Sequence, residues 1–473
     1  MLGLFGTLNL AARSLQTQMT GVEVTGQNLA NVNTTGYSRQ RVQISASPDV
    51  MTSIGPEGTG ADATAIQQIV SNLLNGQIQT QGSTGGYWNA QQTALQSAQN
   101  ALGEFLNGSG ATSSTATATN TTGSGLSTQL NDFFNAFSAL ASSGSDANKQ
   151  AAIGAAQKLA GTFTNIDAQF GNVRSSLNDS LSNDVNSANK LLSEIADLNK
   201  QIFTSEFNGG SANNLRDERE QDLENLSQLT SFTSSSGTNG SVNVTVGGQT
   251  LVSGYNVSDT LQTYDAGGGQ LLVRTANGGV NLTLTGGSMQ GTVDARDGTL
   301  ATMQGSLNHL ASTLITQVNT IHDSGFNSSG GNGNVFFTGS GAADIAVNSA
   351  LKGNPSLLQI SNSSTNTGDT SLALQISQLS SAAQATLGNK TFTGSYNTTV
   401  AGLGDALDHA NTQATNQTAV SNMLSTQRGS ISGVNVDEEM TNMILFQRAY
   451  QASAQVVTTV NTMLGDVLAM KTG

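Results

Sequence analysis

Residues 159–202, LAGTFTNIDAQFGNVRSSLNDSLSNDVNSANKLLSEIADLNKQI, decide the fold class of this chain. Apolar side chains return after three or four residues throughout the stretch, from Leu159 and Phe163 to Leu198 and Ile202. That spacing places them on one face of an α-helix. An unbroken pattern well beyond about 25 residues is typical of a rod or coiled-coil element. We therefore predict a long helical shaft at the centre of the molecule.

Shorter amphipathic patterns lie on both sides of the shaft. They predict helices over residues 66–106 (with a break near Gly85-Gly86), 126–140, 214–229, 303–321, 372–387 and 400–424. Aromatic residues make up only 5% of the chain and charged residues only 10%, well below the usual quarter. We therefore expect few large close-packed cores, and a polar, nearly uncharged surface against which other copies can pack at little electrostatic cost.

The apolar period changes to two between residues 232 and 284. The segments SVNVTVGGQTLVSG (241–254) and QLLVRTANGGVNLTLTGG (270–287) alternate apolar and polar side chains around Gly-rich turns. Alternation of this kind is typical of β-hairpins. We predict a small β module over residues 232–291, inserted in a helical shaft domain made of residues 46–231 and 292–429.

Both ends of the chain carry an apolar repeat of seven residues. At the N-terminus it consists of Leu8, Leu15, Val22 and Leu29; at the C-terminus it consists of Val436, Met443, Tyr450, Val457 and Leu464, with Phe446 and Val460 in the second heptad position. Gly6, Gly21 and Gly26 interrupt the first helix, each at about 1 kcal/mol relative to Ala, so that helix is marginal alone. We predict that residues 1–45 and 430–473 pair as coiled-coil helices in a terminal assembly domain. The expected fold is mainly α and elongated.

The composition excludes several classes of function. The net charge is −14 and no Lys/Arg cluster is present, so neither nucleic acid nor an anionic membrane is an expected partner. The absence of cysteine excludes disulfides, thiolate catalysis and Cys-ligated zinc. The first twenty residues lack the charged and continuously apolar regions of a cleaved signal peptide.

No catalytic constellation emerges from the titratable residues. His309, His322 and His409 form no metal-ligand pair, and we interpret them as polar faces of helices. The charge run RDERE at 216–220 is interpreted as a solvated helix face, and the DARDG segment at 294–298 as a turn before a helix. We therefore predict no catalytic, cofactor-binding or metal-binding residues.

Three motifs provide a more specific signal. They are NLANVNTTGYSRQ at 28–40, SGVNVDEE at 432–439 followed by QRAYQASA at 447–454, and NNLRDERE at 213–220 followed by LENLSQL at 223–229. Together they resemble the rod, hook and hook-associated proteins of the bacterial flagellum, and within that family most nearly the hook-associated type. The motifs lie at the expected ends of the chain and in its middle.

The resemblance implies a structural protein and not an enzyme. Such a protein leaves the cell through the flagellar type III channel without a cleaved signal, and a ring of copies joins the hook to the filament. The implied partners are further copies, the hook protein, a second hook–filament junction protein, and a cytosolic export chaperone on the C-terminal helix; no cofactor is implied. The assembly residues would be the two heptad series above, with Asn31, Asn33, Gly36 and Tyr37 shaping the turn after the first helix.

Two other classes remain open at this stage. One is another flagellar axial protein, either hook or distal rod. The second is a surface adhesin with a helical stalk, although the chain shows neither an anchor pattern nor a cleaved signal pattern.

Overall fold

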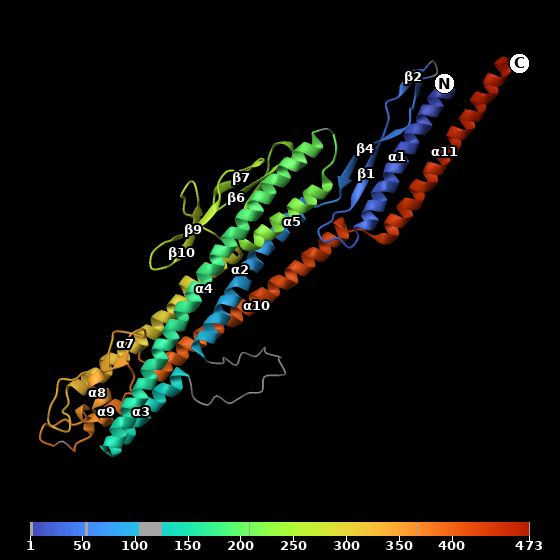
Figure 1. Cartoon of the computed structure of the whole chain (residues 1–473). Coiled ribbons are helices and arrows are strands. Elements are labelled where there is room, and N and C mark those ends of the chain that lie inside the picture. Colours follow the sequence, from blue (N-terminus) through green and yellow to red (C-terminus); the bar gives the residue numbers. More distant parts are fainter. Residues whose placement is uncertain (1–2, 53–54, 104–124, 208, 367, 473) are drawn as a thin grey trace.

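The computed structural model describes residues 3–52, 55–103, 125–207, 209–366 and 368–472. The molecule is elongated, with α1 and α11 side by side at one tip and the shaft running away from them (Figure 1). The helices are α1 (Leu4–Ala30), α2 (Asn72–Leu102), α3 (Leu126–Ser142), α4 (Asp146–Glu206), α5 (Asn213–Leu229), α6 (Gly287–Asp294), α7 (Ala301–Asp323), α8 (Ser349–Gly353), α9 (Ser371–Gln378), α10 (Phe392–Ser432) and α11 (Val436–Thr472). The strands are β1 (Gln40–Ala46), β2 (Val50–Thr52), β3 (Gly55–Glu57), β4 (Ala61–Gln68), β5 (Thr233–Ser236), β6 (Val242–Val246), β7 (Gln249–Ser253), β8 (Asn256–Val257), β9 (Leu261–Asp265), β10 (Leu271–Thr275), β11 (Phe337–Thr338) and β12 (Ala346–Val347).

The predicted helical shaft is confirmed and is longer than the sequence pattern indicated. Helix α4 has 61 residues and therefore extends about 90 Å. The side chain of Ser145 caps its first turn by accepting a hydrogen bond from the Asn148 amide. The apolar series from Leu159 to Ile202 is buried at nearly every position against α2, α3, α5 and the β module. The mainly α, elongated fold class is thus confirmed.

The end of the shaft farthest from the termini contains a large aromatic core, which the low aromatic content of the chain did not lead us to expect. The few phenylalanines of the chain are concentrated there instead of being spread along it. The buried rings are Phe133, Phe134, Phe137, Phe163, Phe170, Phe336, Phe337 and Phe392. Neighbouring centroids such as those of Phe336 and Phe337, 4.7 Å apart, have the edge-on geometry that aromatic rings prefer. A low average aromatic content therefore does not exclude one dense local core.

Helix α2 differs from its prediction at its start and at its glycines. Residues 61–68 form strand β4, so the helix begins at Asn72 and not at residue 66. It runs unbroken through Gly85-Gly86. At this point α2 crosses α5 so closely that a Cβ on Gly86 would lie 2.0 Å from the carbonyl oxygen of Gln228. Glycine at this position permits close helix packing and does not mark a break.

The β module lies along α4 near the middle of the molecule (Figure 1). It consists of an antiparallel sheet in the order β5-β6-β7-β8 and the hairpin β9–β10. Val244, Leu251 and Val273 of these strands share one buried cluster with Leu181 and Leu192 of α4. The hairpin predicted over 241–254 is confirmed as β6–β7. In the segment 270–287 only β10 is a strand, and it pairs with β9, while Asn281 forms an isolated bridge with Arg274. The apolar face of the module is buried against the shaft.

Three smaller sequence predictions need correction. The helix predicted over 372–387 ends at Gln378, and only a short 3₁₀ turn (Ala385–Leu387) follows. The helix predicted over 400–424 extends over the whole of α10. The DARDG segment is not a turn before a helix but a π-helical turn (Ala295–Leu300) that joins α6 to α7, held by the fully buried Arg296.

The sequence patterns did not predict strands between residues 40 and 68. Strands β1 and β4 pair antiparallel, with a bulge between Gln43 and Ile44, and β2 pairs with β3 beyond them. This hairpin packs on α1, where the Thr17 hydroxyl donates to the Ala61 carbonyl at 2.9 Å. Most of its residues are small or polar and half-exposed, so the alternation by which strands are recognised is faint.

Candidate functional site: the terminal helix pair and its joint with the shaft

The two termini pair within one chain. Helices α1 and α11 lie side by side, and we call their contact the terminal seam (Figure 1). The Phe446 ring fills the space beside Gly21, where a Cβ would lie 2.6 Å from the ring, and the hydroxyls of Ser14 and Ser453 are 2.9 Å apart. The predicted pairing of the terminal helices is confirmed. Gly21 does not simply weaken α1, because it makes room for an aromatic ring of α11.

The predicted assembly residues of α1 are not among its buried positions. Leu8, Leu15, Val22 and Leu29 are all half-exposed. The buried positions of α1 are Ala11, Thr17, Gly21, Val24, Thr25 and Asn28 instead. Seven-residue spacing on a helix predicted an apolar stripe correctly, but it did not tell which side of the stripe the partner helix covers.

The predicted residues of α11 divide into two groups. Val460 is buried in the seam, and Met443, Phe446, Val457 and Leu464 are half-buried there. Val436 and Tyr450 are 44% and 40% exposed. Leu445, Val456 and Met463, which the heptad series did not include, are 60%, 41% and 50% exposed. Much apolar surface of α11 is therefore uncovered in the single chain.

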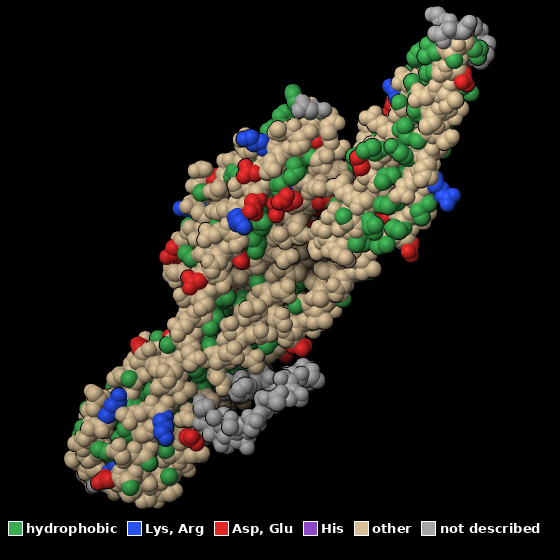
Figure 2. All heavy atoms as spheres, turned by 45° about the vertical axis from the view of Figure 1, so that its right-hand side comes forward, with side chains coloured by type: hydrophobic (Ala, Val, Ile, Leu, Met, Phe, Trp, Pro, Cys, Tyr) green, Lys and Arg blue, Asp and Glu red, His purple; other side chains and the backbone are tan. Residues whose placement is uncertain are grey.

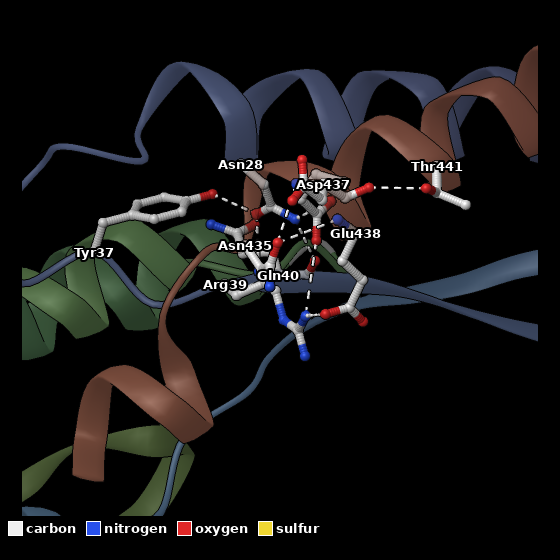
Figure 3. A network of polar contacts seen from close by, with 9 residues as sticks. Asn28, Tyr37, Arg39, Gln40, Asn435, Asp437, Glu438 and Thr441 are labelled. Carbon is white, nitrogen blue, oxygen red and sulfur yellow. Dashed lines mark hydrogen bonds and ion pairs between the residues drawn. The ribbon is translucent and has the colours of Figure 1, made fainter. Parts of the chain in front are cut away.

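Asn28 is the centre of a polar joint between the terminal pair and the shaft (Figure 3). Its amide nitrogen donates to the Gln40 carbonyl at 2.8 Å and to Glu439 Oε2 at 3.0 Å. Its amide oxygen accepts from the Gln40 backbone N–H and from the Tyr37 hydroxyl, both at 2.9 Å. The buried side chain thus makes four hydrogen bonds, which use its full donor and acceptor capacity. Asn28 ties together α1, β1 and α11.

The predicted turn residues follow Asn28 directly. The side chain of Asn31 accepts from the Thr34 hydroxyl at 3.1 Å, and Gly36 has φ +81°, a backbone conformation that favours glycine. Tyr37 points back to Asn28, whereas Asn33 is exposed. Burial, with help from the charges of Asp217 and Glu439, raises the pKa of Tyr37 to about 12, so its hydroxyl remains a donor at neutral pH.

The start of α11 completes the joint from the other end of the chain. The Asn435 side chain accepts from the backbone N–H groups of Asp437 and Glu438 at 3.0 and 3.3 Å, which caps the helix. Arg39 donates to Glu438 at 2.6 Å, and its backbone N–H donates to the Ser432 carbonyl at 2.8 Å. The motifs at residues 28–40 and 432–439, which are far apart in sequence, therefore meet in space.

Helix α5 anchors this joint to the shaft. Asp217 accepts from the Ser38 backbone N–H at 3.0 Å and from the Gln68 side chain at 2.8 Å. Asn213 and Asn214 bond the side chain of Gln40 at 3.1 and 2.9 Å. A polar cavity of about 440 Å³ lies beside these contacts, between residues 35–38, α5 and the end of α10.

The interpretation of residues 216–220 as a solvated face was wrong. Arg219 is buried and donates to Asn199 at 2.7 Å and to the Gly240 carbonyl at 2.8 Å, which connects α5 with α4 and the β module. Burial raises the pKa of Asp217 and of Glu220 and lowers that of Arg219 to about 10. Helical spacing of opposite charges cannot tell a solvated face from one that other elements cover.

The three histidines lie in different surroundings. His309 and His409 are exposed, as predicted, but His322 is fully buried and accepts from the Gln359 backbone N–H at 3.0 Å. Burial lowers the pKa of His322 to about 4, so it is neutral. Within the described ranges, no three His, Asp or Glu side chains come together in a way that could hold a metal ion, and no helix is both long and apolar enough to cross a membrane.

These features define a class of protein: an elongated helical subunit whose two ends pair at one tip and are locked to a shaft by a polar joint. Comparison with known sequences is more specific. A family model described as the helical domain of flagellar hook-associated protein FlgK matches residues 112–337, and one described as the C-terminal part of flagellar basal body rod FlgEFG proteins matches residues 427–470. The chain is 27% identical to flagellar hook-associated protein 1 of Bacillus subtilis over 99% of this chain and 98% of the relative.

Further relatives agree with this assignment. Flagellar hook-associated protein 1 of Escherichia coli is 24% identical over 96% of this chain and 97% of the relative, and that of Salmonella typhimurium is 24% identical over 98% and 99%. The solved structure of the flagellar hook junction protein FlgK from Burkholderia pseudomallei has the same fold, with a TM-score of 0.64 and 18% identity over 75% of this chain and 100% of that one. This chain is similar to flagellar hook-associated protein 1 along nearly all of its length, and the predicted resemblance is confirmed.

Proposed function

We propose that this chain is a structural subunit of the bacterial flagellum that self-assembles at the distal end of the hook and connects the hook to the filament. The observation that carries the proposal is the joint. The motifs at residues 28–40, 213–220 and 432–439 form one continuous hydrogen-bonded network around Asn28 and Asp217. Such a joint fixes the direction in which the terminal pair leaves the shaft, which a subunit of a regular ring requires.

The uncovered apolar surface of the terminal pair supports self-assembly. Figure 2 shows hydrophobic side chains along this part of the molecule and few charged ones. A groove of about 500 Å³ between α1 and α11 is lined by Leu4, Val456, Val460 and Met463, among others. Exposed apolar surface of this extent marks sites of protein–protein contact. We propose that the predicted assembly residues, with Val436 and Tyr450, lie against neighbouring subunits in the ring.

The proposed partners follow from position in the flagellum. They are further copies of the chain, the hook protein on one side, and a second junction protein leading to the filament on the other. Before export, a cytosolic chaperone would cover α11, whose exposed apolar residues would otherwise aggregate. The protein would reach the outside of the cell through the flagellar type III channel with its N-terminus uncleaved. No catalytic step and no cofactor form part of this proposal.

The domain division belongs to the same proposal. We assign residues 1–45 and 430–473 to the assembly domain, residues 46–231 and 292–429 to the shaft, and residues 232–291 to the β module. Strand β4, which this division places in the shaft, also contacts α1 of the assembly domain.

Another axial role, in the hook or the distal rod, is the main rival, since the match over residues 427–470 is to a rod-protein model. Deletion of the gene followed by electron microscopy separates the two roles. Our proposal predicts complete hooks without filaments, filament protein in the medium, and restoration by the intact gene. Absence of hooks would favour the rival, and normal filaments would exclude both.

A further inference from the structure

The terminal domain is built in layers with two different outer sides. The β1–β4 hairpin contacts one side of α1 through Thr17–Ala61 and through the Arg13–Asp62 ion pair at 3.6 Å. Leu15 and Val22 project about 140–160° around the helix axis from Thr17, at about 100° per residue. They therefore lie on the side of α1 away from the hairpin. Figure 1 shows β1 and β4 along one side of α1. Helix α11 packs on the flank of α1 that carries Ser14 and Gly21, next to the side that carries Leu15 and Val22.

The side of the terminal pair away from the hairpin is apolar, and we call it the leucine face. It consists of Leu4, Leu8, Leu15, Met19 and Val22 of α1, with Val456 and Met463 of α11 across the groove. All of these side chains are at least partly exposed, and Met19 is 54% exposed. Glu23, one helical turn after Met19, stands at the rim of this face. It is exposed and is the only carboxylate of α1.

The outer side of the hairpin has the complementary properties, and we call it the hairpin face. Ile44, Val50 and Met51 are 43%, 49% and 79% exposed. Arg41 is exposed at the base of β1. Neither Arg41 nor Glu23 has an ion-pair partner within the described part of the chain. Each face thus offers apolar side chains, and Arg41 and Glu23 are unpaired charges of opposite sign. The hairpin also carries an exposed carboxylate, Asp49, beyond the other end of β1.

The two charges also lie at similar heights along the terminal pair. Arg41 follows Gln40, whose backbone is bonded to Asn28, and Glu23 precedes Asn28 by five residues, about 7.5 Å along the helix. Copies related by rotation about an axis roughly parallel to the terminal helices keep residues at equal heights. In a ring of that kind each copy presents one of its sides to the opposite side of its neighbour.

We propose that the hairpin face of each copy docks on the leucine face of the next copy, with Arg41 pairing with the neighbour's Glu23. The inference rests on the proposed self-assembly and names the surfaces that carry it. It commits to a head-to-tail contact between two unlike faces. An unlike pair of faces propagates around a ring, whereas contact between two like faces ends at a dimer.

Cysteine cross-linking in isolated hook–basal bodies with attached junctions tests this contact. The chain has no native cysteine, so any cross-link between its copies must pass through the introduced cysteines. A strain that expresses Arg41→Cys and Glu23→Cys on separate copies, treated with a short bis-maleimide, should give cross-linked dimers, and a strain with both changes on one chain should give a ladder. Strains with either change alone should give monomers. Arg41→Cys combined with Gln451→Cys, at an exposed polar position of α11 that does not line the groove, is the matched control and should give none.

Two outcomes would overturn the proposal: monomers from the mixed strain, or dimers from a single variant, which would mean contact between like faces. Absence of the chain from the isolated particles would instead overturn the proposed function. Charge reversal adds an independent readout. Arg41→Glu and Glu23→Lys should each weaken association up to about fivefold per interface, and the double variant should restore filament number. A double variant as defective as the singles would also contradict the pairing.

Discussion

Two glycines of α1 are predicted to respond in opposite ways to the same substitution. A methyl group at position 21 would lie 2.6 Å from Cδ1 of Phe446, closer than any real Cβ contact, whereas at position 26 the nearest atom, Met443 Cε, is 4.0 Å away. Each Gly→Ala change raises helix propensity by about 1 kcal/mol. At position 21 this gain is opposed by overpacking, which costs roughly 1–3 kcal/mol, or by the lost burial of Phe446.

Gly26→Ala should therefore stabilise the terminal pair by about 1 kcal/mol, and Gly21→Ala should leave it unchanged or weaken it by up to about 2 kcal/mol. The difference of about 1–3 kcal/mol between the variants corresponds to amide exchange rates that differ roughly 5-fold to 150-fold. Hydrogen exchange followed by mass spectrometry of peptides from α1 and α11 measures it. Phe446→Ala should abolish the difference, because it removes the ring that the added methyl group at position 21 would meet. Equal slowing of exchange in both variants would refute the seam geometry.

The remaining predictions concern the joint, assembly and a buried histidine. Asn28→Ala removes four hydrogen bonds and leaves the Glu439 carboxylate without the amide donor of Asn28, so the free energy of unfolding of the terminal pair, measured with urea, should fall by about 1–3 kcal/mol. Asn33→Ala, at an exposed position, is the control. Tyr450→Asp, at a position 40% exposed, should leave the thermal melt of the free protein unchanged but give hooks without filaments, and a strain with Gln451→Asp should swim far better. Normal filaments on the Tyr450→Asp strain would exclude Tyr450 from the assembly contact. His322 has a pKa of about 4 in the folded chain against 6.5 in the unfolded chain, so as the pH falls the unfolded chain takes up the proton before the folded chain does. The free energy of unfolding should therefore fall as the pH drops from about 6.5 to 4, and His322→Gln should make it depend less on pH.

The elements with strong periodicity could be predicted from the sequence. The shaft, the terminal helices and the hairpins of the β module each repeat their pattern over many residues, and α4 shows it most clearly from Leu159 to Ile202. The hairpin at residues 40–68 could not be recognised in this way. The hairpin packs on α1 through few large apolar residues of its own. Val42 and Ile44 therefore give only a faint alternation.

The candidate site was predicted in part. The motifs around Asn28, Tyr37 and Glu439 could be selected from the sequence, but their meeting in space depends on the pairing of α1 with α11. The role of Asp217 was missed, because a charge run on a helix has the same spacing whether it faces water or a buried joint. The exposed state of Tyr450 and the place of Phe446 against Gly21 depend on which side of each helix faces the other, and heptad spacing alone leaves that open.

The most direct test of the central claim is the position of the chain on intact flagella. An antibody against the β module, which lies on the outside of the shaft, can be visualised with gold particles by electron microscopy. The account predicts a single narrow band of label at the distal end of each hook, where the filament begins, and no label on the deletion strain. Label distributed along the whole hook, confined to the rod, or found on the cell surface away from flagella would contradict it.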